Sequence, residues 1–504
     1  MSCSTLGQTL VASLSESFCF QKKIMANRFL KGCTFVFLLV VMGQPSAFCQ
    51  AQSGAAGSSV QVTIPTSVSQ DGFTGSVPSG NPTPEILPIS FLDAIDRGLK
   101  QNLGLLLSSD NTIAARGERW KELSNLLPNV SAKGQENVQQ TSLIALGIRL
   151  PGLPSVIGPF NYFDARAYLT QSLFNWNYMQ KERAAVENLR AAQYSYQEAR
   201  ELVVLVAGNA YLQAIAGAAR VETAEAQVRT AQTLYDRAVD QQKAGVIPAI
   251  DALRAHVELQ SRQQQLISTR NDFAKQKLTL GRVIGLPLGQ EFTLTDKAPY
   301  DVLVPPTLDE ALKRAFASRP DYQAALAQAR SAELSRRAAT AEHYPSLDME
   351  GDYGVIGVNP ATSNGTFHVG GTINIPIFEG GKVHADVLQA EATLRQAKAR
   401  LADLRGQIDN DVRNALLDLN AAADQVEVAR SSVDLAEQTL AQAQDRFTAG
   451  VSDNLEVVQA QESVASAHEN YISSLYAHNL AKVELARSLG NAEQGVKQYL
   501  MKGK

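Results

Sequence analysis

The sequence predicts a mainly α-helical protein with a smaller β part, in which one structural unit occurs twice. Three observations support this fold class. Short motifs recur in the same order in the two halves of the chain, and each half contains a long stretch without proline, at residues 177–243 and 382–448. Each half also contains short stretches in which apolar residues alternate with other residues. These patterns are typical of a duplication, of long helices and of half-buried strands, in that order.

The composition excludes nucleic acid as an expected partner. Charged residues make up 19% of the 504 residues, and the formal net charge is -4. Lys and Arg are interspersed with Asp and Glu, so no basic stripe forms along the chain. Aromatic residues make up only 7%, whereas Ala, Gln and Leu dominate long stretches. This bias favours long packed helices over a compact α/β enzyme.

Residues 1–51 are typical of a signal peptide. Arg28 and Lys31 precede an apolar run at residues 33–42, and the small residues Ser46, Ala47 and Ala51 follow. Met25 is an alternative start, because a signal peptide that begins at Met1 is unusually long. Residues 52–88 are rich in Ser, Gly, Pro, Thr and Gln, so we expect a flexible tail there.

All four cysteines lie before residue 50: Cys3, Cys19, Cys33 and Cys49. The rest of the chain therefore has no thiol for a disulfide framework, a metal site or a nucleophile. Lipidation of Cys49 stays open, although the bulky Phe48 precedes it. After the signal peptide we expect no stretch of about 20 apolar residues, so any membrane crossing would use β-strands.

Paired motifs define the two copies. Residues 91–95 recur as residues 308–312, and Pro128 matches Pro345. Because further pairs follow in the same register, we interpret them as a duplication. We expect a first structural repeat at 89–286, an inter-repeat linker at 287–306, a second repeat at 307–490 and a C-terminal tail at 491–504.

Each copy should begin with two helices that end near its proline, because proline lacks a backbone donor. Two strands of about ten residues should follow, a length that suits a tilted crossing of a membrane. In the second copy one strand alternates at Leu347, Met349, Gly351, Tyr353 and Val355, and the next at Phe367, Val369, Gly371, Ile373, Ile375 and Ile377. In the first copy the alternation is at Phe163, Ala165, Ala167 and Leu169.

Long helix pairs should complete each copy. In the second copy, apolar residues recur every seven positions at Val412, Leu419, Val426, Val433, Leu440 and Phe447. Beyond a turn at Gly450, the spacing continues at Val457, Val464, Tyr471 and Leu485, with His478 interrupting it. Such spacing predicts coiled-coil packing. A helix of roughly 65 residues would be about 100 Å long at 1.5 Å per residue.

Four strands in one chain cannot close into a membrane barrel. The smallest such barrels have about eight strands, and an open edge in lipid leaves backbone groups unpaired. Several copies must therefore combine. Three copies would supply twelve strands around one pore, and their long helices would surround a hollow cylinder.

The order of these features over residues 89–490 resembles the TolC-like outer membrane factor family. The resemblance depends on the duplication, the proline-to-strand transitions, the two Gly-Val turns and the stretch Phe378-Glu379-Gly380-Gly381 that opens a long helix. The first copy departs from this pattern, since it reads Phe174-Asn175-Trp176-Asn177.

The resemblance implies a homotrimer with a β-barrel in the outer membrane, continued by a long α-helical coiled-coil barrel in the periplasm. It implies a passive channel that conducts small molecules or proteins to the exterior, with contact to outer-membrane lipid. A periplasmic adaptor protein would be its direct partner, and an inner-membrane pump an indirect one.

The resemblance also assigns roles to residues near the two helix-pair turns. Adaptor contact falls on Gly245, Val246, Ile247 and Pro248 in the first turn, and on Gly450, Val451, Ser452 and Asp453 in the second. Glu456 corresponds to a constricting acid of the channel, Gln459 stands where a second acid is often found, and Asp251 is a candidate latch. The alternatives are that the glycines only permit the turns and that these three side chains are ordinary solvated helix residues.

Other functions remain as alternatives. A periplasmic coiled-coil adaptor or scaffold also has long heptad hairpins, but it has one hairpin rather than two. A coiled-coil surface protein would not explain the strand pair that ends near Phe378. We expect no enzyme, because no Gly-x-Ser-x-Gly or His-Glu-x-x-His motif occurs. The scattered histidines and the incomplete phosphate loop at Gly380-Gly381-Lys382 predict no metal and no cofactor.

Overall fold

A computed structural model describes residues 70–145, 147, 151–152, 154–296, 301, 303–449, 451–452 and 454–500. The expected signal peptide, the four cysteines, Gly450 and Asp453 lie outside the described residues. Everything below concerns the compact unit that contains the described residues.

One series of elements occurs twice along the chain. The first series is α2 (Phe91–Gln101), α3 (Leu103–Ser124), β2 (Asn129–Ser142), β3 (Val156–Phe174), α4 (Trp176–Lys243) and α5 (Ala249–Val283). The second is α6 (Leu308–Ser318), α7 (Pro320–Thr340), β5 (Ser346–Gly357), β6 (Asn364–Asn374), α8 (Lys382–Thr448) and α9 (Asn454–Ser488). A last helix, α10 (Ala492–Leu500), follows.

Short elements accompany the two series. They are η1 (Gln70–Phe73), β1 (Leu87–Ile89), β4 (Phe292–Leu294), η2 (Ala341–His343) and η3 (Pro360–Thr362). The predicted mainly helical fold with a small β part is confirmed. Two details of the strands differ from expectation: β2 and β3 are longer than ten residues, and Ile375 and Ile377 lie beyond the end of β6.

The two long helices begin in different ways. The side chain of Asn175 caps α4 by accepting the backbone N–H of Tyr178 at 3.1 Å. In contrast, α8 follows Gly380 and Gly381, which both adopt positive φ, at 63° and 86°. Glycine adopts this conformation without the steric cost that a Cβ brings. An asparagine cap at the start of α4 thus stands where α8 has a glycine-dependent turn, so the two sequence motifs differ.

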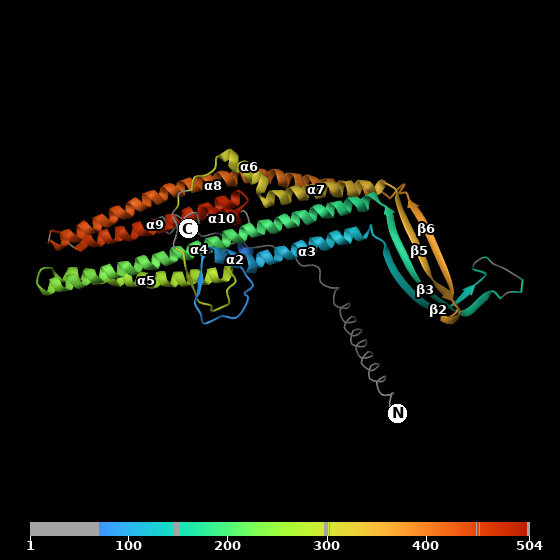
Figure 1. Cartoon of the computed structure of the whole chain (residues 1–504), viewed down its shortest axis with the longest axis horizontal. Helices are drawn as coiled ribbons and strands as arrows, with labels where there is room; N and C mark the ends of the chain where they lie inside the picture. The colour runs from blue at the N-terminus through green and yellow to red at the C-terminus, as the bar shows by residue number, and fades with distance from the viewer. Residues whose placement is uncertain are drawn as a thin grey trace, which may run out of the picture. The chain divides into compact units, whose positions relative to one another are not determined.

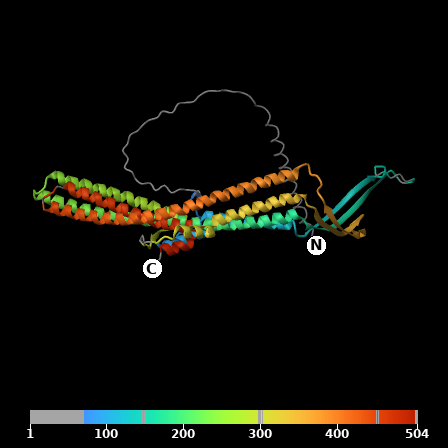
Figure 2. The same cartoon turned by 90° about the horizontal axis from the view of Figure 1, so that it is seen from above.

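The long helices lie side by side and end at the same side of the bundle. In the half of the bundle nearer the α4–α5 and α8–α9 turns, α5 packs on α4, α4 on α9 and α9 on α8 (Figure 1). Nearer the strands, α3 packs on α4, α4 on α7 and α7 on α8. The four strands continue from the far ends of these helices, opposite the α4–α5 and α8–α9 turns (Figure 2).

A buried seam runs along α8 and α9 at the predicted spacing. Val412, Val426 and Val457 are 0% exposed. His478, which interrupts the apolar pattern in the sequence, occupies the seam position one heptad before Leu485 and is also buried. Its Nε2 lies 3.3 Å from the carbonyl oxygen of Asp301. The histidine therefore continues the seam and holds the inter-repeat linker.

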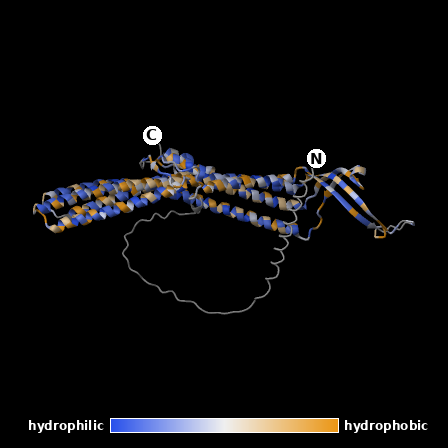
Figure 3. Cartoon of the chain, turned by 90° about the horizontal axis from the view of Figure 1, so that it is seen from below, coloured by the Kyte–Doolittle hydropathy of each residue, from blue (hydrophilic) through white to orange (hydrophobic). Residues whose placement is uncertain are grey.

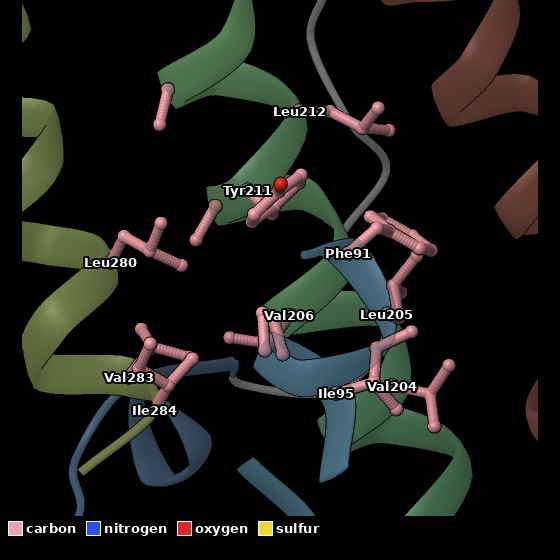
Figure 4. Close-up of a cluster of buried hydrophobic side chains, with 14 of the residues drawn as sticks. Phe91, Ile95, Val204, Leu205, Val206, Tyr211, Leu212, Leu280, Val283 and Ile284 are labelled. Atoms are coloured by element: carbon pink, nitrogen blue, oxygen red, sulfur yellow. The ribbon is translucent and has the colours of Figure 1, made fainter. Parts of the chain in front are cut away.

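The largest apolar core lies at the middle of α4. Phe91 of α2 meets Tyr211 of α4 edge to face, with ring centroids 5.5 Å apart, and Leu280 and Ile284 close the core from the α5 side (Figure 4). The Tyr211 hydroxyl donates to the carbonyl oxygen of Ile89 at 2.9 Å. This core joins the start of the first repeat to its last helix.

One sequence expectation needs correction at this core. Within α4, one stretch is long and apolar enough to cross a membrane by length and composition alone. However, 78% of that stretch is buried inside the protein. Its apolar character therefore serves the core between α2, α5 and α9 rather than indicating a membrane helix.

Residues 70–88, which composition assigns to a flexible tail, contact the helices. The N–H of Val77 donates to the carbonyl of Gln101 at 2.9 Å, and the N–H of Thr83 donates to the Gln290 side chain at 2.7 Å. Strand β1 pairs in parallel with β4, which lies in the expected linker. These contacts tie the linker to the beginning of the first repeat.

Candidate functional site

The strands form one antiparallel sheet in the order β2-β3-β5-β6. The two hairpins, one from each series, meet where β3 pairs with β5, with Arg166 opposite Gly354 and Tyr168 opposite Asp352. Among the described residues, β2 and β6 each have a neighbour on one side only. Both outer strands thus present unpaired backbone groups.

The register separates a polar face from an apolar face. Because side chains alternate along a strand, residues opposite one another share a face. The polar face carries Lys133, Asp164, Arg166, Asp348, Glu350, Asp352, Thr366 and His368. The apolar face carries Val130, Val138, Phe163, Leu169, Met349, Tyr353, Phe367, Val369 and Ile373. The alternation is visible along the strands in Figure 3.

The apolar face is exposed in the single chain. Tyr353 is 70% exposed, Phe367 77% and Val369 71%. Soluble proteins rarely expose a contiguous apolar surface of this kind, so the face requires an apolar environment or partner.

Arg166 joins three strands on the polar face. Its guanidinium donates to Asp164 at 2.7 Å, to Asp352 at 2.6 Å and to Thr366 at 3.3 Å. Gly354 lies directly opposite, and a Cβ there would collide with the backbone and Cβ of Arg166. A glycine at this position therefore lets the arginine connect the first hairpin to the second.

Exposed aromatic side chains gather where the strands give way to helices. Phe174 and Trp176 have ring centroids 6.5 Å apart at the β3–α4 junction. Tyr344 just before β5 is 53% exposed, and Phe378 just before α8 is 86% exposed. The rings of Trp176 and Tyr344 are amphipathic, and such rings are typical of an interface between an apolar and an aqueous medium.

The α4–α5 turn is a Schellman motif. Gly245 has φ of 74°, its N–H donates to Gln242, and the N–H of Val246 donates to Gln241 at 2.9 Å. The same spacing occurs at the α8–α9 turn, where the N–H of Val451 donates to the carbonyl oxygen of Arg446 at 3.0 Å. Glycine is required by the positive φ at the first turn, so the turn itself accounts for Gly245.

The other residues of the two turns differ in exposure. Val246 and Val451 are exposed at 68% and 71%. Ile247 instead packs beside Ala238, Ala252 and Ala255 and thereby closes the first hairpin. Pro248 precedes α5 as its N-cap, and the partly buried Ser452 lies in the second turn.

Asp251 and Glu456 lie in the first turns of α5 and α9, and Gln459 lies one turn further along α9. Oε1 of Glu456 lies 3.3 Å from Nη1 of Arg446 on the neighbouring helix of the same hairpin. Oδ1 of Asp251 lies 3.3 Å from Nη1 of Arg254, one turn further along α5. Gln459 is exposed on α9. These ion pairs form within each hairpin, so they do not by themselves join the two hairpins.

Polar contacts between the α4–α5 and α8–α9 helix pairs occur farther from the turns, at residues that the sequence patterns did not single out. Arg220 of α4 donates to Glu469 of α9 at 3.0 Å and to Ser473 at 3.1 Å. Tyr476 donates to Asn209 at 2.6 Å, again between α9 and α4. Nothing in the local pattern distinguishes these residues from other helical polar side chains. Only the pairing of α4 with α9 brings them together.

A cavity of about 230 Å³ lies between the Arg220 contact and the turns. It is lined by α4, α5, α8 and α9 residues, among them Arg262, Glu437 and His468. Nε2 of His468 lies 3.2 Å from Oε1 of Glu437. Beyond the cavity, Leu234 of α4 packs with Phe447 and Val457 of the other hairpin. The hairpins therefore touch on both sides of a looser region.

Buried charges concentrate at the middle of the helices. Lys482 is 1% exposed and its Nζ donates to the Asp301 carbonyl at 2.6 Å. Arg319 is 7% exposed and bonds Asp321 at 2.6 Å and Asp411 at 3.1 Å. Burial lowers the pKa of Lys482 and raises the pKa of Glu484.

Comparison with protein families gives one match that spans most of the chain. The family described as "Outer membrane efflux protein" matches residues 114–286 and 311–491. These two segments correspond to the two series of elements, from α3 to the end of α5 and from α6 to the end of α9.

Comparison with curated proteins gives relatives that are each 23% identical to this chain. Outer membrane protein TolC of Escherichia coli is 23% identical over 358 residues, which cover 66% of this chain and 70% of that protein. Toluene efflux pump outer membrane protein TtgC of Pseudomonas putida is 23% identical over 411 residues, which cover 79% of this chain and 82% of that protein.

Solved structures share the fold. The outer membrane channel CmeC of Campylobacter jejuni has a TM-score of 0.70 at 18% identity, with 87% of this chain and 97% of that chain covered. The open state of the MtrE outer membrane channel of Neisseria gonorrhoeae has a TM-score of 0.68 at 20% identity, with 81% and 89% covered. At these identities the likeness establishes the fold alone.

Proposed function

Because this chain belongs to the outer membrane efflux protein family, we propose that three copies form an outer-membrane channel of a tripartite export system. The channel passively conducts small molecules or proteins from a pump–adaptor complex to the exterior. The single observation that carries the proposal is a sheet with one polar face, one apolar face and two unpaired edges.

The faces of the sheet match the two media of a membrane pore. The exposed apolar face, with Tyr353 and Phe367, suits acyl chains, and the polar face around Arg166 suits water. The exposed amphipathic rings of Trp176 and Tyr344 suit the border of the membrane facing the periplasm.

The edges of the sheet explain the need for several copies. In lipid, each unpaired backbone group costs several kcal/mol. Neighbours in the sheet are antiparallel throughout, so β2 and β6 run in opposite directions. Pairing β6 of one copy with β2 of the next would therefore continue the up-and-down pattern. Three copies close a ring of twelve strands, which is more than the minimum of about eight.

The internal duplication fits this assembly. Each copy of the unit contributes one hairpin of the sheet and one long helix pair. A helix of 68 residues such as α4 is about 100 Å long, which suits a duct that extends from the membrane into the periplasm.

The helix turns are the proposed end of the duct in the periplasm. Exposed apolar residues there, Val246 and Val451, suit contact with an adaptor protein, together with Gly245, Ile247, Pro248, Gly450, Ser452 and Asp453. Glu456 is proposed to line the constriction, with Gln459 one turn further on. Three symmetry-related carboxylates near an axis would favour cations. Asp251 is proposed as a latch residue.

The alternative of a periplasmic adaptor or scaffold is not supported, since the family and the relatives are outer membrane efflux proteins. Purification from outer membranes in detergent, followed by electron microscopy and planar-bilayer recording, tests the proposal. Threefold particles that conduct ions are expected. Recovery as a soluble monomer without conductance would refute it.

A further inference from the structure

The cavity of about 230 Å³ described above lies inside one chain, where the α4–α5 and α8–α9 helix pairs face each other. Farther from the turns, Arg220 of α4 donates to Glu469 of α9 at 3.0 Å. Nearer the turns, Leu234 of α4 packs with Phe447 and Val457. These contacts hold the two helix pairs together on both sides of the cavity. Ligand sites in helical bundles are commonly built between facing helices in this way.

The cavity has room for a molecule with a single ring. Ala226 of α4, Leu440 of α8 and Val464 of α9 give its wall apolar surface. An apolar cavity of about 150 Å³ accommodates benzene. A volume of about 230 Å³ therefore accommodates a six-membered ring with one or two substituent atoms.

A buried amide also lines the cavity. Gln461 of α9 is 8% exposed, yet no hydrogen bond joins its side chain to another residue in the part of the chain that the structure describes. A buried polar group without a partner destabilises a protein, so this amide requires a partner inside the cavity. Because an amide both donates and accepts, a hydroxyl group can pair with it.

The charged groups at the cavity occur as pairs. Nε of Arg262 donates to Oε1 of Glu258 at 2.6 Å, and these side chains are 15% and 14% exposed. Nε2 of His468 lies 3.2 Å from Oε1 of Glu437. A charged ligand would compete with these pairs, and separating a buried pair leaves a charge without compensation. A neutral ligand leaves both pairs in place.

We propose that this cavity binds a small neutral molecule that consists of one ring and one hydroxyl group. The ring packs on Leu440 and Val464, and the hydroxyl group pairs with the amide of Gln461. All of the lining residues belong to one chain, so the inference goes beyond the proposed function and does not require that three copies assemble. A bound molecule touches both helix pairs and therefore stabilises their packing.

Phenol and toluene are the probes, because they have similar size and only phenol carries a hydroxyl group. Titration calorimetry on the purified full chain in detergent measures both affinities. The variants Ala226→Leu and Val464→Phe place extra carbon atoms in the cavity, so their heats report the uptake of each probe by the detergent alone. The wild type should show additional, saturable heat that corresponds to one molecule per chain. Its melting temperature should rise with phenol concentration relative to that of both filled variants.

Gln461→Met tests the hydrogen bond, because it keeps the length of the side chain and removes the amide. The ratio of the affinities for phenol and toluene should fall about tenfold in this variant, since a site built to bond a hydroxyl group discriminates against a ligand without one. The matched control is Gln438→Met, which changes an exposed glutamine of α8 outside the cavity. This control should leave the ratio unchanged.

Two results would overturn the inference. One is a wild-type heat that does not saturate or that equals the heat of the filled variants. The other is an unchanged affinity ratio in Gln461→Met, which would mean that water alone pairs with the amide. Circular dichroism shows whether each variant folds, and Gln461→Met decides the matter even if both filled variants unfold. Either result leaves the proposed channel in place, because its conductance is measured without phenol.

Discussion

The middle of the helices and their turn ends are held together in different ways. At the middle, Phe91 and Tyr211 lie in a dense apolar core, and buried charges such as Lys482 reach across to the linker. At the ends, small residues and ion pairs such as Glu456 with Arg446 act within single hairpins, and a small apolar cluster around Leu234 and Phe447 joins the two hairpins. The two hairpins are therefore joined by a large core at the middle and by a much smaller apolar cluster near the turns. Because fewer buried apolar residues join the hairpins near the turns, local opening there should cost less free energy than opening of the middle.

Among the substitutions that test this difference, Phe91→Ala should lower the free energy of unfolding the most. The ring is 4% exposed and touches Tyr211, so its loss leaves a cavity in the main core. Substitutions of this kind cost about 3–5 kcal/mol. Denaturant unfolding followed by helical circular dichroism measures the cost. Leu288→Ala, at a site that is 91% exposed, should change the free energy of unfolding by less than about 0.5 kcal/mol. Equal effects at the two sites would contradict a rigid middle.

The buried His478 should make stability depend on pH. Burial and then the nearby Lys482 lower its pKa, so the folded state disfavours the charged ring. Stability from this group is present above the unfolded pKa of about 6.5 and is lost as pH falls toward the lower folded pKa. Melting temperatures between pH 7.5 and pH 5 should fall more steeply for the wild type than for His478→Gln. Parallel curves would mean that the ring titrates as it does in the unfolded chain.

Glu484→Gln should have a smaller effect on the melting temperature than the changes above, and it should raise this temperature. Burial and then Asp418 raise the pKa of Glu484, so its charged form is disfavoured in the folded state. For a raised carboxyl pKa, stability grows as pH falls from the folded pKa toward the unfolded value of about 4.3. The variant should therefore melt higher than the wild type at pH 7.5, with a difference that shrinks at lower pH. Glu462→Gln, exposed on the same helix, is the control and should show no such trend.

Glu456→Ala should have the smallest effect on stability. Its pair with Arg446 is 3.3 Å long and both side chains are more than a third exposed. Exposed ion pairs contribute about 0–1 kcal/mol. In planar bilayers, however, the same variant should weaken the preference of the channel for cations. The control Glu462→Ala removes an equal charge away from the proposed constriction and should leave this preference unchanged. An unchanged reversal potential for Glu456→Ala would remove this residue from the constriction.

The local sequence pattern was sufficient to predict where the long helices begin and end. The proline-free stretches 177–243 and 382–448 match α4 and α8 to within one residue. Alternation at Leu347 to Val355 and Phe163 to Leu169 placed β5 and part of β3. The alternation did not predict where the strands end, because apolar residues continue past β6 into the exposed segment before α8. Neither the alternation nor the spacing showed that α4 also carries a buried apolar core.

The sequence by itself determined the helix lengths, the glycine turns, the alternating strands and the repeated order, because each depends on residues close together in the chain. The tertiary structure decided which helices meet. Arg220 donates to Glu469 because α4 packs on α9, and Arg166 donates to Asp352 because β3 pairs with β5. Lys482 donates to the linker, which is also far from it in the chain. Such contacts join residues far apart in the chain. They are selected by the free energy of packing whole surfaces, and no local pattern records that energy.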